Sequence, residues 1–364
     1  MRVRHRHHGG VRVLHVIAAD RWTGAAATAL QAVEALRDVG VDCHFAFRGG
    51  HNLAARLADR PWAHPVLTKI TSPAHLAAAV RVVRRLARDA QLVHVHLPQD
   101  HLLARLAGSR AMVRSIHHPG HTGNPYYRLL LRGVGGIGLA YGDMAETLPR
   151  TIRATVPHLP LPVAVEPRFR PGDGSAVRSR LGVPADAVLV GTIGKLDAGR
   201  GHAEVVAAVA RCPRAWGMVI GKGPYAPRLA ALAHELGAAS RIVFPGYVEE
   251  GLESLYAAMD LFVFPAAGSD WAHRAIAEAA GCGVPTLAAD LPGVRDLVAP
   301  GVTGDLFPPG DVDALAALLR SWSADAPLRR AAGAAARARA EREWTARRLA
   351  DACLTLYRAA VPPS

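Results

Sequence analysis

The sequence predicts an α/β protein built from two doubly wound parallel-sheet domains. Apolar runs of strand length alternate with Ala/Leu/Arg-rich helical stretches on both sides of a proline-rich segment, which is typical of parallel strands joined by crossover helices. The chain has 364 residues and is 50% hydrophobic. Single domains usually run to about 100 to 200 residues, so this length accommodates two cores.

The domain boundary is expected in the proline-rich segment 157–172, because repeated prolines cannot continue a helix or a central strand. We therefore predict a first domain over residues 1–160, with residues 1–10 as a basic flexible tail, and a second domain over 161–340. The terminal segment 341–364 has apolar residues spaced on one helical face, namely Leu349, Cys353, Leu356, Tyr357 and Ala360.

A glycine-rich loop over residues 194–202 follows the apolar run 187–193 and carries two cations, Lys195 and Arg200. Ligands of parallel sheets bind at the carboxyl ends of strands, where this loop is expected. Fixed positive charge and backbone N–H donors are what a diphosphate requires. The loop is therefore a candidate phosphate site, although two solvated loop charges are the ordinary alternative.

Two carboxylates, Asp270 and Glu278, bracket the start of an Ala-rich helix that is expected to begin near Ala272, after a buried strand at 261–264. At 1.5 Å of rise per residue they would lie about 10 Å apart along the helix axis. Ionised carboxylates only accept hydrogen bonds, so they suit the hydroxyls of a ribose and a hexose. Together the two loops predict a nucleotide-sugar site. An ordinary helix cap at Asp270 and a solvated Glu278 are the alternative.

These loops and their flanks resemble family 4 of the retaining GT-B glycosyltransferases, also called glycosyl transferases group 1. In that family a Gly-Arg-x4-Lys-Gly loop holds the donor diphosphate, and a Glu-x7-Glu motif holds the donor sugar and the ribose. Here Lys195 and Arg200 exchange the usual order, and Asp270 replaces the first Glu. Further pieces follow in family order, covering roughly residues 187–320: 221–224, 244–247, 280–285, 292–294 and 308–311.

The N-terminal half resembles the family more weakly. Residues 11–18 read as a first strand, and the following turn keeps only Gly24 of the usual Gly-Gly pair. Residues 92–98 and 113–118 resemble two further family strands. His117 falls where the family carries a histidine close to the donor sugar.

The resemblance implies a GT-B architecture with a cleft between the two domains, a final helix that crosses back to the first domain, and a retaining reaction without cofactor or metal. The leaving phosphate oxygen would accept the acceptor proton on the face where the new bond forms. The implied catalytic residues are His117, Lys195, Arg200 and Asp270. The implied donor-binding residues are Gly24, Lys195, Arg200, Tyr247, Asp270, Ala272, His273, Arg274 and Glu278. Glu278 would bind the ribose, and His273 stands where the family commonly has Gly.

Two alternatives come from the same C-terminal half. A relative that binds nucleotide without catalysis would keep much of this pattern. A dehydrogenase is favoured only by residues 221–226, which read as Gly-x-Gly-x-x-Ala after a strand at 218–220. That fingerprint requires an acidic residue at the end of the next strand, whereas the strand at 241–244 ends in Pro-Gly.

Histidines crowd one stretch, and two of them, His94 and His96, would point to the same face of a strand; the full set is His94, His96, His101, His117, His118 and His121. A metal-dependent hydrolase is therefore a further alternative. Zinc needs three or four ligands, and Asp100 is the nearby carboxylate. We interpret most of these histidines as polar strand-end residues, with one near the sugar.

Charge is distributed unevenly along a chain with a formal net charge of +13: residues 1–160 carry 21 Lys and Arg against 9 Asp and Glu, and the remainder carries 22 against 21. We expect the basic first domain to meet an anionic lipid-linked or saccharide acceptor at a membrane face, with a solubilising surface as the alternative. No aromatic-rich motif favours nucleic acid.

Four scattered cysteines favour reduced thiols in a cytosol. The apolar run after the basic tail, about eight residues long, is too short to span a membrane. We therefore expect a cytoplasmic protein at the inner face of the membrane.

Overall fold

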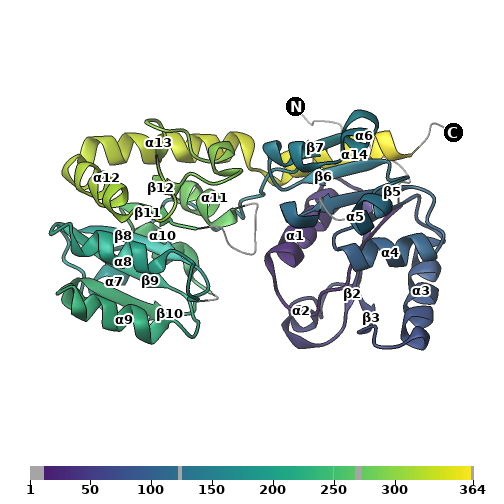
Figure 1. Ribbon diagram of the computed structural model, residues 1–364, viewed down its shortest axis with the longest axis horizontal. Helices are drawn as coiled ribbons and strands as arrows, with labels where there is room; N and C mark the ends of the chain where they lie inside the picture. Colours follow the sequence, from purple (N-terminus) through teal and green to yellow (C-terminus); the bar gives the residue numbers. More distant parts are fainter. Residues whose placement is uncertain (1–11, 122–124, 249, 267–272, 362–364) are drawn as a thin grey trace, which may run out of the picture. The chain divides into compact units, whose positions relative to one another are not determined.

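The computed structural model describes residues 12–121, 125–248, 250–266 and 273–361 (Figure 1). Its contacts divide into two units. The described residues up to Ala164 and from Ala346 onward form the first unit, and those from Val165 to Thr345 form the second.

The first unit contains a seven-stranded parallel sheet with the order β3-β2-β1-β4-β5-β6-β7. The chain therefore reverses its direction of winding between β1 and β4. The strands are β1 (Arg12–Ile17), β2 (Asp42–Arg48), β3 (Ala63–Leu67), β4 (Leu92–Val95), β5 (Met112–Ile116), β6 (Gly136–Leu139) and β7 (His158–Pro160).

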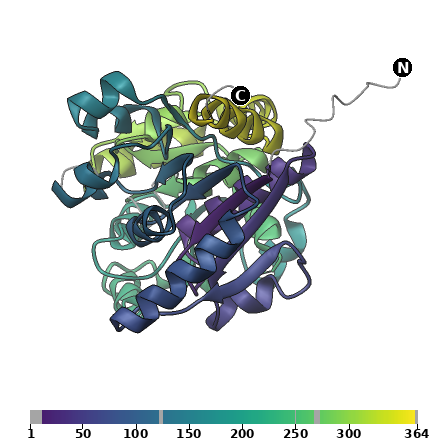
Figure 2. The same cartoon turned by 90° about the vertical axis from the view of Figure 1, so that its right-hand side faces the viewer.

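Helices cover both faces of this sheet, as is usual for a doubly wound fold. On one face α1 and α14 pack over a core that includes Val13 and Val113, and on the other α3 and α4 pack over Leu14 and Val93. Figure 2 shows the unit from a second side. Its helices are α1 (Gly24–Asp38), α2 (His51–Arg56), α3 (Pro73–Ala87), α4 (Pro98–Leu106), α5 (Pro125–Leu130), α6 (Arg150–Thr155) and α14 (Ala346–Ala360).

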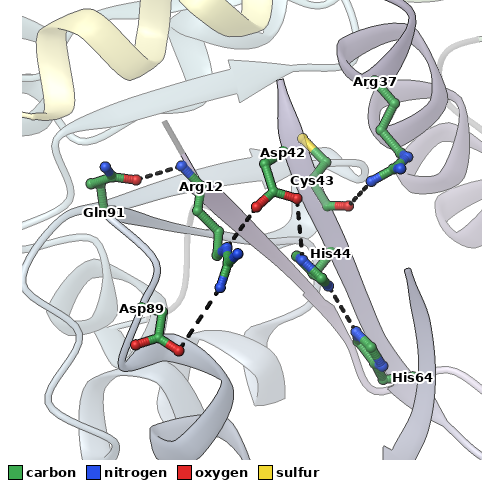
Figure 3. Close-up of polar contacts among 8 residues, drawn as sticks. All are labelled: Arg12, Arg37, Asp42, Cys43, His44, His64, Asp89 and Gln91. Carbon is green, nitrogen blue, oxygen red and sulfur yellow. Dashed lines mark hydrogen bonds and ion pairs between the residues drawn. The ribbon is translucent and has the colours of Figure 1, made fainter. Parts of the chain in front are cut away.

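Polar side chains join the amino-terminal parts of neighbouring strands in this unit (Figure 3). The Arg12 guanidinium on β1 lies 2.6 Å from the Asp42 carboxylate on β2. His44 on β2 and His64 on β3 form a hydrogen bond of 2.9 Å with stacked rings. These contacts lie at the opposite end of the sheet's strands from His117, which follows β5.

The boundary between Ala164 and Val165 falls inside the expected segment 157–172, but two details differ from the prediction. The proline-rich segment does not begin as a linker, because His158–Pro160 pairs with β6 as the edge strand β7. An edge strand tolerates proline since one of its sides needs no ladder hydrogen bonds. The single terminal helix is also interrupted at Trp344, where α13 (Ala326–Glu343) ends before α14 begins.

The second unit contains a six-stranded parallel sheet with the order β10-β9-β8-β11-β12-β13. Its reversal lies between β8 and β11, and both predicted doubly wound sheets are therefore confirmed. The strands are β8 (Val188–Ile193), β9 (Ala215–Ile220), β10 (Ile242–Gly246), β11 (Leu261–Phe264), β12 (Thr286–Ala289) and β13 (Gly304–Phe307). The helices are α7 (Ser175–Arg180), α8 (His202–Ala210), α9 (Ala226–Glu235), α10 (Leu252–Ala258), α11 (Arg274–Gly281), α12 (Val312–Ala324) and α13.

None of the helices in the described part of the chain has both the length and the apolar character needed to cross a bilayer.

Candidate functional site

The loop with Lys195 and Arg200 leaves the end of β8, beside the reversal of the second sheet. Gly199 and Gly201 have φ angles of +77° and +74°, a left-handed conformation that glycine adopts without steric cost. The side chain of Lys195 is 67% exposed and lies 2.6 Å from Asp197. Arg200 is half-buried, and this desolvation lowers the pKa of its guanidinium. Both predicted cations therefore sit in one tight turn at the carboxyl end of a strand.

A second glycine-containing turn, after β9, packs directly against the first. A Cβ atom on Gly221 would lie 1.8 Å from the carbonyl oxygen of Gly194, and one on Gly223 would lie 2.1 Å from that of Leu196. The Leu196 N–H also donates to the Lys222 carbonyl at 3.0 Å. The glycines that suggested a dinucleotide fingerprint are thus required for the contact between two loops of this unit.

Lys222 is a third cation of this region, and the sequence interpretation did not include it. Its Nζ atom lies 4.1 Å from the ring centroid of Tyr247, whose side chain follows β10 and is 51% exposed. A cation over an aromatic face is held electrostatically. The sequence offered one indication of Lys222, namely its place in the turn after the strand β9. That strand neighbours β8 in the sheet, so the two turns lie at the same edge.

Helix α11 presents Glu278 in a fixed conformation. Its side chain is about nine-tenths buried, with Oε1 lying 3.2 Å from Arg274 Nε. The Tyr256 hydroxyl on α10 donates to Oε2 at 3.1 Å. Burial, followed by the nearby Glu278 carboxylate, raises the pKa of Tyr256 well above its usual value. Tyr256 therefore stays a neutral donor, and no sequence motif pointed to it.

His273 precedes α11 and has a φ angle of +50°, which is left-handed. Glycine is the residue that adopts this conformation freely, so the family's preference for Gly here has a steric reason. The buried ring bonds through Nε2 to the Pro292 carbonyl at 2.8 Å. Helix α11 begins at Arg274 rather than near Ala272. Asp270 and Ala272 lie outside the described residues.

The remaining predicted residues, Gly24 and His117, belong to the first unit. Gly24 is the first residue of α1, directly after the Thr23 cap. His117 follows β5 and is 8% exposed, with Nε2 lying 3.3 Å from His96 Nδ1. The structure thus places the loop of Lys195 and Arg200 against the turn of Lys222, which contacts Tyr247. It also pairs Arg274 with Glu278. Gly24 and His117 belong to the first unit.

His94 lies near the end of β4 and His96 directly after it, as expected of strand-end residues, whereas His101 lies on α4. All three are buried. His15, on the adjacent strand β1, joins His94 and His96, and their ring nitrogens lie within 4.8 Å of one another, close enough to be considered for a metal ion. Burial lowers the pKa of His15 to about 3 and those of His94 and His96 well below their usual value. The cluster is therefore neutral at physiological pH. The pairing of His15 with His94 depends on strand register, which the sequence alone did not supply.

Comparison with known proteins agrees with this geometry. The family model of glycosyl transferases group 1 matches residues 175–339. The D-inositol 3-phosphate glycosyltransferase of Mycobacterium avium (strain 104) is 36% identical over 205 residues, which are 53% of this chain and 47% of that protein. The 2-deoxystreptamine N-acetyl-D-glucosaminyltransferase of Streptomyces fradiae is 33% identical over 220 residues, with shares of 57% and 52%. The chain spans about half the length of these curated relatives.

Solved structures show the same fold over nearly the whole chain. The Anabaena protein HepE in complex with UDP and glucose has a TM-score of 0.80 at 20% identity, covering 96% of this chain and 100% of that one. A glycosyltransferase from Rickettsia africae has a TM-score of 0.84 at 14% identity, covering 98% and 100%. The protein therefore has the GT-B fold, and its residues 175–339 belong to the glycosyl transferases group 1 family.

Proposed function

We propose that the protein is a retaining glycosyltransferase, which moves a sugar from a nucleoside-diphosphate sugar to an acceptor hydroxyl. The observation that carries this proposal is the set of cations on packed turns at the reversal of the second sheet: Lys195, Arg200 and Lys222. Preorganised positive charge stabilises the negative charge that develops on a departing diphosphate. The family match and the glycosyltransferase relatives support the same activity.

Glu278 is proposed to accept the hydrogen bonds of the ribose hydroxyls. Its carboxylate is already oriented by Tyr256 and Arg274, so little side-chain entropy would be lost when a ribose binds. Asp270 is proposed to contact the transferred sugar and His117 to approach it from the first unit. We propose that the reaction needs no metal or cofactor. UDP is the first nucleotide to test, because HepE was solved with UDP and with UDP-glucose.

The test is calorimetry with the nucleoside diphosphate that raises the melting temperature most in a screen of UDP, GDP, ADP and dTDP. Lys195→Ala and Arg200→Ala are each expected to weaken diphosphate binding by about 1.5 to 3 kcal/mol, the usual contribution of a charged hydrogen bond. Binding of the nucleoside should change far less. Arg320→Ala, an exposed arginine on α12 of the same unit, serves as the control for a general change in charge.

Equal losses for diphosphate and nucleoside would contradict the phosphate assignment. Tight nucleotide binding without hydrolysis or transfer from any nucleotide-sugar would instead identify a non-catalytic relative.

An anionic acceptor at a membrane face is proposed for the first unit. Three of the large apolar side chains exposed on the described surface, Leu106, Tyr126 and Leu129, lie on α4 and α5, which contact each other. Exposed arginines accompany them on or next to these two helices: Arg105, Arg128 and Arg132. Apolar side chains among basic residues suit the surface of an anionic bilayer.

Co-sedimentation of the full chain with neutral and anionic vesicles tests this surface. Binding should require anionic lipid, fall as salt rises, and weaken in Leu129→Glu more than in Leu236→Glu, a matched exposed leucine of the second unit. Equal binding to both vesicles, or none at low salt, would leave a soluble acceptor as the interpretation.

A further inference from the structure

The buried ring of His202, the first residue of α8, packs against the loop that carries Lys195 and Arg200. A Cβ atom on Gly194 would lie 3.2 Å from Nε2 of this ring. The other ring nitrogen, Nδ1, lies 3.5 Å from the hydroxyl oxygen of Thr192, which is buried on β8. The imidazole therefore contacts both the end of β8 and the loop that leaves it.

The ring also forms a hydrogen bond with the main chain of Lys195. This bond raises the pKa of His202, as a bond from a ring N–H to a carbonyl oxygen does. A carbonyl oxygen only accepts, so the direction of the bond is fixed and the ring donates. Nδ1 faces Thr192, which leaves Nε2, the nitrogen beside Gly194, as the donor to Lys195.

His202 adds no charge to the loop. Its pKa is lowered to about 4, chiefly by burial; the bond to the Lys195 carbonyl opposes this change, and the Arg200 guanidinium adds to it. The ring is therefore neutral at physiological pH. His202 thus supplies packing and a hydrogen bond beside the two cations rather than a third positive charge.

The Lys195 carbonyl is also an acceptor within the loop. It accepts the Asp197 N–H at 3.0 Å, and the Asp197 carbonyl accepts the Arg200 N–H at 3.3 Å. The His202 ring therefore donates to the same oxygen around which the loop turns. On the far side the loop is open, because a Cβ atom on Gly199 would meet no atom within 4 Å. Support from the His202 side is thus important for the shape of the loop.

We propose that His202 is a positioning residue, which holds this loop in the conformation that presents Lys195 and Arg200 to the donor diphosphate. Loss of its hydrogen bond releases the Lys195 carbonyl and lets the loop sample other conformations. The two cations are then no longer preorganised, and binding has to order them. The consequence for binding rests on the proposed function, whereas the effect on the loop does not.

Two conservative variants of the full chain isolate the loop bond. In His202→Gln the amide nitrogen lies near the position of Nε2 and still donates to the Lys195 carbonyl. In His202→Asn the amide lies near Nδ1, about one methylene short of that carbonyl. His202→Asn should therefore weaken binding of the diphosphate that the melting screen selects about tenfold, which corresponds to about 1.4 kcal/mol, the order of one buried hydrogen bond. His202→Gln should bind it like the wild type.

Calorimetry with the diphosphate and with its nucleoside measures these affinities, and the nucleoside should bind both variants equally well. Val209→Ala, in the last turn of the same helix, removes buried packing alone. It should lower the melting temperature without changing the ratio of the two affinities. Equal diphosphate affinity in His202→Asn and His202→Gln would overturn the proposal, and so would equal losses for diphosphate and nucleoside.

Hydrogen exchange of the ligand-free protein tests the loop itself. The Asp197 and Arg200 amides donate within the loop, and they should exchange about tenfold faster in His202→Asn than in the wild type or in His202→Gln. Unchanged exchange in His202→Asn would overturn the role of His202. If the wild type binds none of the four diphosphates, the proposed function fails, while the exchange rates still decide whether His202 holds the loop.

Discussion

The two sheets share the same order over six strands, to which the first sheet adds β7. They carry different side chains at the point where this order reverses. In the first unit, beside β1 and β4, the buried carboxylate of Asp100 accepts the Ala18 N–H through Oδ1 and the Leu97 N–H through Oδ2, both at 2.6 Å. In the second unit, the turn beside β8 and β11 carries Lys195 and Arg200.

This difference shows what topology decides and what it leaves to side chains. A doubly wound sheet creates a binding position where its strand order reverses. In the first unit the protein's own carboxylate takes up backbone donors that an anionic ligand would need. In the second unit cations are added at the corresponding place. The strand order therefore gives two candidate positions, and the side chains make the one in the second unit suitable for the proposed diphosphate.

The largest expected effect is on turnover. Replacing both Lys195 and Arg200 by Ala should lower kcat of the donor reaction by about a hundredfold to a thousandfold, because fixed charge at the leaving group is lost. Steady-state assays of donor hydrolysis or transfer measure this. Unchanged turnover in the double variant would place the leaving-group site elsewhere.

The next effect is on stability in the first unit. Asp100→Ala leaves the Ala18 and Leu97 amides without their acceptor, and it should lower the free energy of unfolding by about 3 kcal/mol. Asp197→Ala, which removes a partly exposed ion pair of the second unit, should cost less than about 1 kcal/mol. Urea denaturation of the full chain compares them. Similar losses of unfolding free energy in the two variants would show that the hydrogen bonds of Asp100 do not stabilise the first unit specifically.

Acidification should lower the stability of the first unit more than that of the second. Between pH 6.5 and 3 the unfolded chain protonates His15 while the folded chain does not, so stability falls as pH falls through this window. With a folded pKa of about 3, His15 alone costs about 2 kcal/mol at pH 5. His94 and His96 act in the same direction. Asp100 opposes them, because burial raises its pKa to about 7 and acidification relieves that cost.

In the second unit burial lowers the pKa of His202 to about 4. Hydrogen exchange of the full chain at pH 7 and pH 5, corrected for intrinsic rates, should therefore show a greater loss of protection in β1 and β4 than in β8 and β11. A greater loss in the second unit would contradict the prediction.

The smallest effect concerns helix caps. His273 caps α11 at a φ angle of +50°, whereas Thr23 caps α1 at −126°. His273→Gly should be about 1 kcal/mol more stable than His273→Ala, because only glycine avoids the left-handed penalty. The same pair at Thr23 should differ by about 0.7 kcal/mol, because Ala at an N-cap costs about 1 kcal/mol and Gly only a few tenths. Thermal denaturation of the four variants measures both differences.

Sequence patterns located the strands around the site because apolar runs there end in glycine or proline. The predicted runs 187–193 and 261–264 agree with β8 and β11 within one residue. The hydrogen bond from Tyr256 to Glu278 could not be predicted, because it is a tertiary contact between two helices. The partnership of His15 with His94 required strand register.

Helix α14 has a consequence for how the protein is made. Its Leu349, Cys353, Leu356 and Tyr357 complete the core of a unit whose other elements all precede residue 165. During synthesis the amino-terminal part emerges first, yet its apolar face lacks this cover until the whole second unit has been translated. A ribosome that stops before residues 346–360 are translated would release a chain with an exposed core, which quality-control proteases recognise.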